Sequence, residues 1–234
     1  MVILNALRKH TATVIFVHGL GDSGLGWKPV ASMLSQNPSL QHIKWVLPDA
    51  PSIPVTLNYG MTMPAWFDIV DLGFAGTEDE KGMLKTVHSL NQLITAEVDA
   101  GIPADRIVLG GFSQGAAMTL LTGLTTERKL AGLTVLSGWL PLKDKFKAMV
   151  NDHFKKLPIF WGHGTRDQVV RYVYAEQSVE FLKSIGVKDA VSEPSAKPVG
   201  LSFHSYAGLE HSTSPKELDD LQRWIEQVIP DVSE

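Results

Sequence analysis

The chain has 234 residues and a formal net charge of −4, with 44% hydrophobic and 20% charged residues. These values are ordinary for a globular protein, and the length predicts one large α/β domain over residues 1–234. The acidic balance leaves no basic patch, so nucleic acid is not expected as a partner. The absence of cysteine excludes disulfides, zinc–thiolate sites and a thiol nucleophile.

The sequence shows no targeting or membrane-spanning segment. Residues 1–7 are too short for the apolar region of a signal peptide, and no apolar run approaches the roughly 18 residues of a membrane span. We therefore expect a soluble cytoplasmic protein, with the nucleus as a further location.

The first predicted element is a buried strand over residues 13–17, T-V-I-F-V, which delivers the glycine-rich loop H-G-L-G-D-S-G. This loop lacks the G-K-[ST] ending of a P-loop and the G-x-G-x-x-G spacing of a dinucleotide site. In serine hydrolases, the loop after an early strand supplies one NH group to the oxyanion hole, so Leu20 NH is a candidate donor. His18 is interpreted as a structural histidine that fixes the loop.

A long proline-rich stretch follows a predicted helix over residues 27–35 and a predicted strand over residues 43–47. Four prolines interrupt residues 48–72 and exclude a long helix or a central strand there. Long ordered loops in compact domains are usually functional. Trp66 and Phe67 are expected to pack this loop onto the core. For Leu57, Met61 and Met63, core packing and an apolar wall beside the active site both stay open, because methionine suits adaptable binding surfaces.

A long amphipathic helix is predicted next. Residues 77–80 read T-E-D-E, a capping box that predicts a helix N-terminus at Thr77. Apolar residues then recur at helical spacing, namely Met83, Val87, Leu90, Ile94 and Val98. The helix is expected to end near Gly101.

The most informative stretch spans residues 106–121. Residues 107–109 predict a short buried strand that Gly110 and Gly111 end, and residues 116–121 predict a helix. Between them lies G-F-S-Q-G, the strand-turn-helix pattern that exposes a nucleophilic serine, here Ser113. Gly111 and Gly115 leave room for the sharp turn. The first NH groups of the new helix, including that of Gln114, point at the space where an oxyanion forms. A plain Gly/Ser turn is the alternative, which this flanking context disfavours.

The second half continues the alternation of strands and helices. A strand is predicted over residues 133–136, and Trp139 and Leu140 follow it. A further strand is predicted over residues 158–161. The segment H-G-T-R-D follows that strand, and a helix is predicted over residues 172–185. Residues 186–198 are read as a surface excursion and residues 201–206 as the last strand. S-P-K-E at residues 214–217 predicts a capped terminal helix, whose apolar face is Leu218, Leu221, Trp224 and Val228.

This alternation implies a mainly parallel sheet with helices on both faces, so the loops after its strands gather at one edge. Three such loops carry Ser113, Asp167 and His211, in the order of an α/β-hydrolase triad. His211 would accept the Ser113 proton, and Asp167 would orient and stabilise the imidazolium. His163 and His204 compete as the base, but each is interpreted as structural. The competing acids lie in polar, exposed stretches: Asp144, Asp152 and Asp189.

Six ordered blocks resemble the acyl-protein thioesterases, also called lysophospholipase I, which are related to bacterial carboxylesterases. The blocks are H-G-L-G-D-S-G, M-P-A-W-F-D, G-F-S-Q-G, S-G-W-L-P-L, H-G-x-x-D and G-L-E-H-S, and the match runs over residues 13–229. The resemblance implies an α/β-hydrolase fold with a mostly parallel central sheet. It also implies cleavage of palmitoyl groups from protein cysteines and of lysophospholipids, without a metal or other cofactor.

The resemblance also assigns residues to roles. It implies a triad of Ser113, Asp167 and His211, with Leu20 and Gln114 as oxyanion donors. The implied acyl-binding surface is Leu57, Met61, Met63, Trp139 and Val169. The chain departs from the family pattern H-G-D-x-D-P-L-V-P where Thr165 replaces the first acid and residues 168–171 replace the closing P-L-V-P, and Ala116 stands where a glycine is common. Residues 186–198 form a longer stretch than usual.

The leading hypothesis is therefore a serine hydrolase that acts on long-chain acyl thioesters of proteins. The alternative within the same chemistry is a carboxylesterase or lysophospholipase for small acyl esters, because Ser113 would attack either carbonyl. A non-catalytic binding protein on a hydrolase scaffold is disfavoured by the complete triad pattern. We expect S-acylated proteins or lipid-like acyl esters as partners, only transient membrane contact, and a monomer or weak homodimer.

Overall fold

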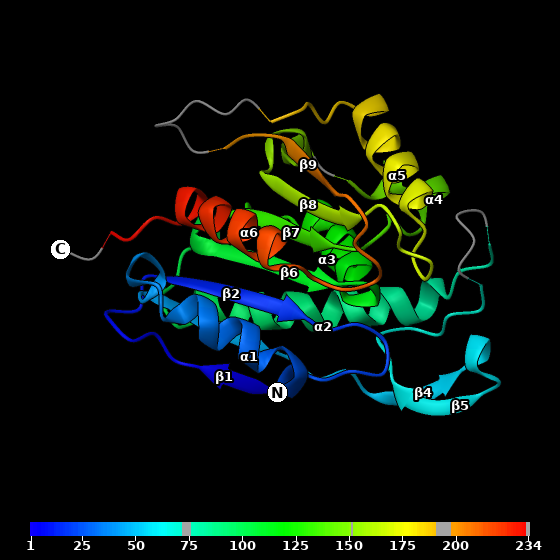
Figure 1. Cartoon of the computed structure of the whole chain (residues 1–234), viewed down its shortest axis with the longest axis horizontal. Coiled ribbons are helices and arrows are strands. Elements are labelled where there is room, and N and C mark those ends of the chain that lie inside the picture. The colour runs from blue at the N-terminus through cyan, green and yellow to red at the C-terminus, as the bar shows by residue number, and fades with distance from the viewer. Residues whose placement is uncertain (72–75, 151, 191–197, 233–234) are drawn as a thin grey trace.

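The computed structural model describes residues 1–71, 76–150, 152–190 and 198–232. A seven-stranded sheet with the order β1-β3-β2-β6-β7-β8-β9 forms its centre (Figure 1). Its strands are β1 (Val2–Leu4), β2 (Ala12–Val17), β3 (Ile43–Leu47), β6 (Ile107–Phe112), β7 (Gly132–Leu136), β8 (Ile159–Gly164) and β9 (Leu201–Tyr206). Every neighbouring pair is parallel except β1 and β3. The predicted mainly parallel sheet is confirmed.

Helices cover both faces of the sheet (Figure 1). One face carries α1 (Gly24–Ser35) and α6 (Pro215–Val228), and the other carries α2 (Glu80–Asp99), α3 (Gln114–Thr125), α4 (Lys143–Met149) and α5 (Tyr172–Ser184). In β2, Val14 and Phe16 join the core under α1 and α6, whereas Ile15 and Val17 join the opposite core. Burial on both faces explains why this strand is apolar throughout instead of alternating.

The nucleophile strand is longer than its sequence indicates. β6 continues through Gly110 and Gly111 to Phe112, so the prediction that these glycines end the strand is wrong. A Cβ atom on Gly110 would lie 2.1 Å from Oγ1 of Thr134, and one on Gly111 would lie 2.5 Å from the Gly115 carbonyl. The glycines are therefore needed for close packing against the next strand and the next turn.

The start of α2 also differs from its prediction. The helix begins at Glu80 with Asp79 as the N-cap, because the Asp79 side chain accepts a hydrogen bond from Gly82 NH at 2.9 Å. The predicted capping box at Thr77 is therefore wrong. Glu78 instead accepts the Leu142 NH at 2.9 and 3.0 Å, which ties the start of this helix to the loop after β7. The predicted end holds, since the helix closes at Asp99 before Gly101, whose φ is +99°.

Several elements were not predicted from the sequence. The proline-rich stretch contains a two-stranded antiparallel hairpin of β4 (Ser52–Val55) and β5 (Met61–Pro64), separate from the main sheet. The edge strand β1 and the helix α4 were also not predicted, and α1 begins at Gly24, three residues earlier than expected. The described residues also form short 3-10 helices at Pro38–Leu40, Thr56–Asn58, Ala104–Arg106 and Asp152–Lys156.

The C-terminal third follows its prediction closely. β9 has the expected bounds, and Ser214 caps α6 by accepting the Glu217 NH at 3.2 Å. Within the predicted surface excursion, Val187 is buried and Asp189 bridges to Leu201, while residues 191–197 lie outside the described residues. In the described parts of the chain, no helix is long and apolar enough to cross a membrane.

Candidate active site

Ser113 occupies a sharp turn between β6 and α3. Its φ of 54° and ψ of −120° place a non-glycine residue in a sparsely populated conformation. The Ser113 NH donates to the Leu136 carbonyl at 2.9 Å, which holds the turn against β7. A Cβ atom on Gly115 would lie 2.1 Å from the Val17 carbonyl, so only glycine permits this approach to β2. The surrounding backbone therefore fixes the strained turn, as the G-x-S-x-G pattern predicts.

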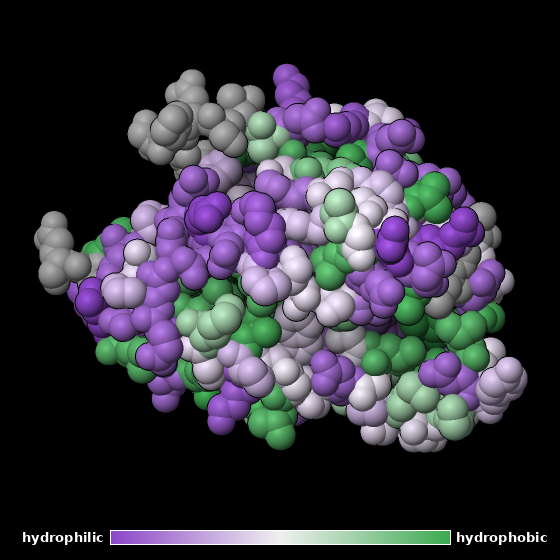
Figure 2. All heavy atoms as spheres, in the orientation of Figure 1, coloured by the Kyte–Doolittle hydropathy of each residue, from purple (hydrophilic) through white to green (hydrophobic). Residues whose placement is uncertain are grey.

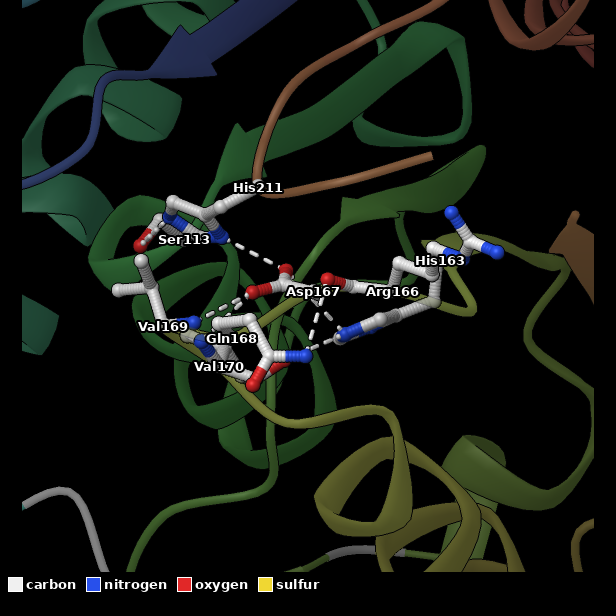
Figure 3. Close-up of polar contacts among 8 residues, drawn as sticks. All are labelled: Ser113, His163, Arg166, Asp167, Gln168, Val169, Val170 and His211. Carbon is white, nitrogen blue, oxygen red and sulfur yellow. Dashed lines mark hydrogen bonds and ion pairs between the residues drawn. The ribbon is translucent and has the colours of Figure 1, made fainter. Parts of the chain in front are cut away.

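The structure brings Ser113, His211 and Asp167 together in one line of hydrogen bonds (Figure 3). His211 Nδ1 lies 2.7 Å from Asp167 Oδ2, and His211 Nε2 lies 2.9 Å from Ser113 Oγ. Because a carboxylate only accepts, Nδ1 carries the proton and Nε2 is left to accept from the serine hydroxyl. The three side chains come from the loops after β6, β8 and β9, at the carboxyl edge of the sheet.

Asp167 is held by a compact backbone turn. Its side chain is fully buried, and Oδ1 accepts the NH groups of Val169 and Val170 at 2.9 Å each (Figure 3). The two NH groups satisfy one carboxylate oxygen, so the other is directed at His211. The local sequence after β8 thereby sets the orientation of the carboxylate.

Backbone contacts join the Asp167 loop to the His211 loop. The Arg166 NH donates to the Leu209 carbonyl at 3.0 Å, and the Gly208 NH donates to Thr165 Oγ1 at 3.0 Å. A Cβ atom on Gly164 would lie 2.2 Å from the Leu209 carbonyl, so glycine is required where the loops cross. Thr165, noted in the sequence only as a departure from a family pattern, is therefore a structural link between two site loops.

The two competing histidines have other partners. His163 is fully buried and its Nε2 donates to the Val170 carbonyl at 2.8 Å. Burial lowers its pKa, which favours the neutral ring. His204 stacks on Phe160 with ring centroids 4.7 Å apart. Of the three histidines weighed as the base, His211 is the one within hydrogen-bonding distance of Ser113.

The candidate oxyanion loop lies directly against the serine. A Cβ atom on Gly19 would lie 3.3 Å from Ser113 Cβ, so the loop after β2 packs on the nucleophile turn. Within the part of the chain that the structure describes, no backbone or side-chain acceptor takes the Leu20 NH. The Gln114 NH belongs to the first turn of α3, whose NH groups lack acceptors within the helix. Both groups therefore stay candidates for stabilising an oxyanion.

The ordered contacts of His18 match the structural role predicted for it. Its Nδ1 lies 2.7 Å from the Gly19 carbonyl and donates to it, while its Nε2 accepts the Ala50 NH at 3.0 Å. Both ring nitrogens are thus occupied in one tautomer. The ring is fully buried and fixes the backbone at Gly19, next to the candidate donor Leu20.

Known proteins match this chain over nearly its whole length. A model of the phospholipase/carboxylesterase family matches residues 1–229. The chain belongs to this family. It is 52% identical to the acyl-protein thioesterase 1 of Cryptococcus neoformans, covering 94% of this chain and 93% of that protein. It is 47% identical to the acyl-protein thioesterase 1 of Mycosarcoma maydis, and the match covers 95% of this chain and 93% of that protein. The crystal structure of Zea mays acyl-protein thioesterase 2 is similar with a TM-score of 0.82 and 30% identity, over 97% of each chain.

In this phospholipase/carboxylesterase chain, the Gln114 side chain has a role that sequence reasoning missed. The side chain is fully buried, accepts the Trp66 NH at 2.9 Å and donates to the Phe67 carbonyl at 2.8 Å. Trp66 Nε1 in turn donates to the His18 carbonyl at 2.8 Å. The amide therefore ties the nucleophile helix to the loop after β5 and, through Trp66, to the candidate oxyanion loop. Burial of Trp66 and Phe67 confirms that both pack onto the core.

Phe112 is a second residue that the motif analysis left without a role. It precedes the serine, and its ring packs against that of His211 with centroids 4.8 Å apart. On its other side it meets Trp27 of α1 at 5.4 Å. This tilted ring contact packs against the imidazole, whose Nδ1 is hydrogen-bonded to Asp167.

The five expected acyl-binding residues lie in three segments of the chain: the β4–β5 hairpin, the loop after β7 and the loop after β8. Met63 and Trp139 are partly buried and pack against the core that contains α3, and Trp139 meets Phe67 edge-on at 6.3 Å. Leu57 and Met61, on the β4–β5 hairpin, are 39% and 58% exposed. Figure 2 shows hydrophobic residues beside this hairpin at the lower right, and a mixture of pale and light green residues over the hairpin itself. Val169 is 47% exposed and adjoins Asp167 through its NH group.

Proposed function

We propose that this chain is a serine hydrolase that cleaves long-chain acyl thioesters, such as palmitoyl-cysteine, on proteins. The observation that carries the proposal is the hydrogen-bonded line from Ser113 through His211 to the buried Asp167. Ser113 lies at the carboxyl edge of the sheet, where ligands of open α/β sheets bind. The names of the relatives above support acylated protein as the substrate class.

The geometry supports acyl transfer through a covalent intermediate. Ser113 Oγ attacks the thioester carbonyl while His211 Nε2 takes its proton, and Asp167 stabilises the resulting imidazolium. The NH groups of Leu20 and Gln114 donate to the oxyanion of the tetrahedral intermediate. As that intermediate collapses, the carbon–sulfur bond breaks, and the His211 proton passes to the leaving thiolate.

The second half of the reaction regenerates the serine. Water attacks the acyl-serine while His211 accepts a proton from it, and the same oxyanion donors act again. Collapse breaks the bond to Ser113 Oγ, which recovers its proton from His211, and the free fatty acid leaves. Asp167 needs no proton of its own in either half, consistent with its two backbone NH donors.

Apolar residues beside the triad suit a long acyl chain. Leu57, Met61 and Met63 on the hairpin, with Trp139 and Val169, are proposed to line its path. Each methylene removed from water contributes about 0.8 kcal/mol, so such a surface favours long chains over acetyl groups. The exposed Leu57 and Met61 of the hairpin also suit transient contact with the membrane that holds an acylated protein. A cytoplasmic location is a further part of the proposal.

The direct test compares palmitoyl, octanoyl and acetyl groups carried as thioesters and as oxyesters. We expect the highest kcat/KM on long-chain thioesters, and loss of all turnover and of fluorophosphonate labelling in Ser113→Ala. Ser137→Ala, which removes a buried hydroxyl after β7, serves as the matched control and should keep its label. Labelling and activity that survive in Ser113→Ala would refute the assignment of the nucleophile.

The second candidate function is a carboxylesterase or lysophospholipase. The family match by itself supports it, because the family is described as phospholipase/carboxylesterase. The same triad would cleave an oxyester by the same steps. Faster turnover of short oxyesters or lysophospholipids than of long-chain thioesters would select this function instead.

A further inference from the structure

A cavity lies at the opposite edge of the sheet from the triad. Its volume is about 380 Å³, within the lower range of small-molecule sites, which run from roughly 300 to 1,000 Å³. Its walls include Ala131 and Pro158, which directly precede β7 and β8, and Gly123 near the end of α3. Ser113, by contrast, follows the carboxyl end of β6 and starts α3. The two sites therefore lie at opposite ends of the same helix and sheet.

The floor of this cavity is apolar. Leu130, Phe154 and Leu157 line it and are 3%, 5% and 7% exposed. The flanking prolines, Pro158 and Pro198, are also buried and have no NH group to donate. A ligand that reaches this floor thus meets hydrocarbon surface, which suits an alkyl chain.

The rim of the cavity is cationic. Arg128, Lys129 and Lys156 lie on it, against a single carboxylate, Asp105. Within the described ranges, Lys129 and Lys156 form no ion pair or hydrogen bond through their side chains and are exposed. Arg128 is anchored by a hydrogen bond from Nη2 to Thr95 Oγ1 at 3.2 Å, which leaves its other donors available. This local positive excess stands out in a chain of net charge −4.

We propose that this cavity binds a free medium-chain fatty acid, with the alkyl chain on the apolar floor and the carboxylate at the cationic rim. Charge complementarity at the rim selects an anion, and the buried floor selects a hydrocarbon tail. Inorganic phosphate would satisfy only the rim, and a neutral alcohol would satisfy only the floor. The site does not depend on the proposed reaction, because it lies away from the triad.

The experiment maps octanoate binding on the full chain by amide NMR shifts and calorimetry. The amides of Gly123, Leu130 and Leu157 report on this cavity, and those of Leu20 and Ser113 report on the triad. Lys129→Glu/Lys156→Glu reverses two rim charges. The matched control is Lys81→Glu/Lys85→Glu, which changes the same charge on the exposed face of α2. Unchanged melting temperatures of both variants show that the exposed substitutions leave the fold intact.

We expect saturable shifts at the cavity amides and affinity that rises about fourfold per methylene from hexanoate to octanoate. The rim variant should bind at least tenfold more weakly, and the control variant like the parent. Shifts confined to the triad amides would overturn the proposal while leaving the hydrolase proposal intact. Equal affinity for 1-octanol, equal affinity for phosphate, or undiminished binding by the rim variant would also overturn it.

Discussion

At the scale of single residues, the choice of base depends on partners that sequence order does not reveal. His163, His204 and His211 all lie within or follow the last two strands. The order of the strand-end loops favours His211, and the contacts show that it is the one beside Ser113. We predict that His211→Ala lowers kcat/KM on the order of 10³-fold or more, because proton transfer in both half-reactions is lost. His204→Ala should lower it less than tenfold. Steady-state kinetics on one substrate checks this, and the reverse ranking would transfer the role of base to His204.

The Gln114 amide gives a second prediction at this scale. Gln114→Ala removes the partners of the Trp66 NH and the Phe67 carbonyl, and both are buried. Unsatisfied buried groups of this kind cost about 1–3 kcal/mol each, so the free energy of unfolding should fall by at least that amount. Urea denaturation measures the change, with the exposed Gln92→Ala as the control. Equal stability of the two variants would show that water replaces the lost amide.

At the scale of elements, the β4–β5 hairpin and the loop after β7 are predicted to set chain-length selectivity. Leu57→Asp or Trp139→Ala should reduce kcat/KM far more on long acyl chains than on acetyl esters, because buried methylenes lose their apolar surface. Leu84→Asp is the matched control, since Leu84 of α2 is 41% exposed and Leu57 is 39% exposed. Losses of equal size on long and short substrates would mean that these residues support the fold.

Elements with strong local patterns could be predicted from sequence, and elements fixed by distant partners could not. β3 and β9 have the expected bounds because each is a short run of strand-forming residues between turn formers. The hairpin was missed because prolines argue against central strands, yet Pro54 and Pro64 lie in a separate pair of strands. α2 begins at Glu80 because Asp79 caps it, and Glu78 is not part of a capping box because it binds the Leu142 NH, 64 residues away. That contact has no local signature.

The same division applies to the candidate site. Ser113, Asp167 and His211 were selected from motifs, and the structure places them in contact. The supporting groups were not selected, since the Gln114 amide and the Phe112 ring act through residues distant in sequence. The catalytic roles of Ser113, Asp167 and His211 are predictions, which Ser113→Ala and His211→Ala test.

At the scale of the whole molecule, one buried carboxyl makes stability depend on pH. Glu217 of α6 is fully buried against β8, where a Cβ atom on Gly162 would lie 2.3 Å from Glu217 Oε1. Burial raises the pKa of Glu217 to about 7, the Ser214 backbone NH opposes the shift, and nearby Asp220 adds to it. Between about pH 4.5 and 7 the unfolded chain loses this proton while the folded chain keeps it. Stability therefore falls as pH rises through this window.

Glu217→Gln tests this dependence. The amide cannot ionise, so the difference in unfolding free energy between pH 5 and pH 8 should shrink by about 2 kcal/mol. Chemical denaturation at the two pH values gives the difference for each protein. Asp219→Asn, on the same helix, is the control for loss of one carboxylate. An unchanged difference in Glu217→Gln would place the titration on other groups.

The wide spacing of the site residues along the chain has a consequence for synthesis on the ribosome. Ser113 and His211 are 98 positions apart, and His211 follows the edge strand β9. A nascent chain that has already emerged through α3 carries the serine but no imidazole beside it. Its hydroxyl then has no base to activate it. If the proposed triad is the reactive centre, Ser113 gains its base only after the chain has been made through β9 and His211, so a shorter nascent chain should not acylate itself.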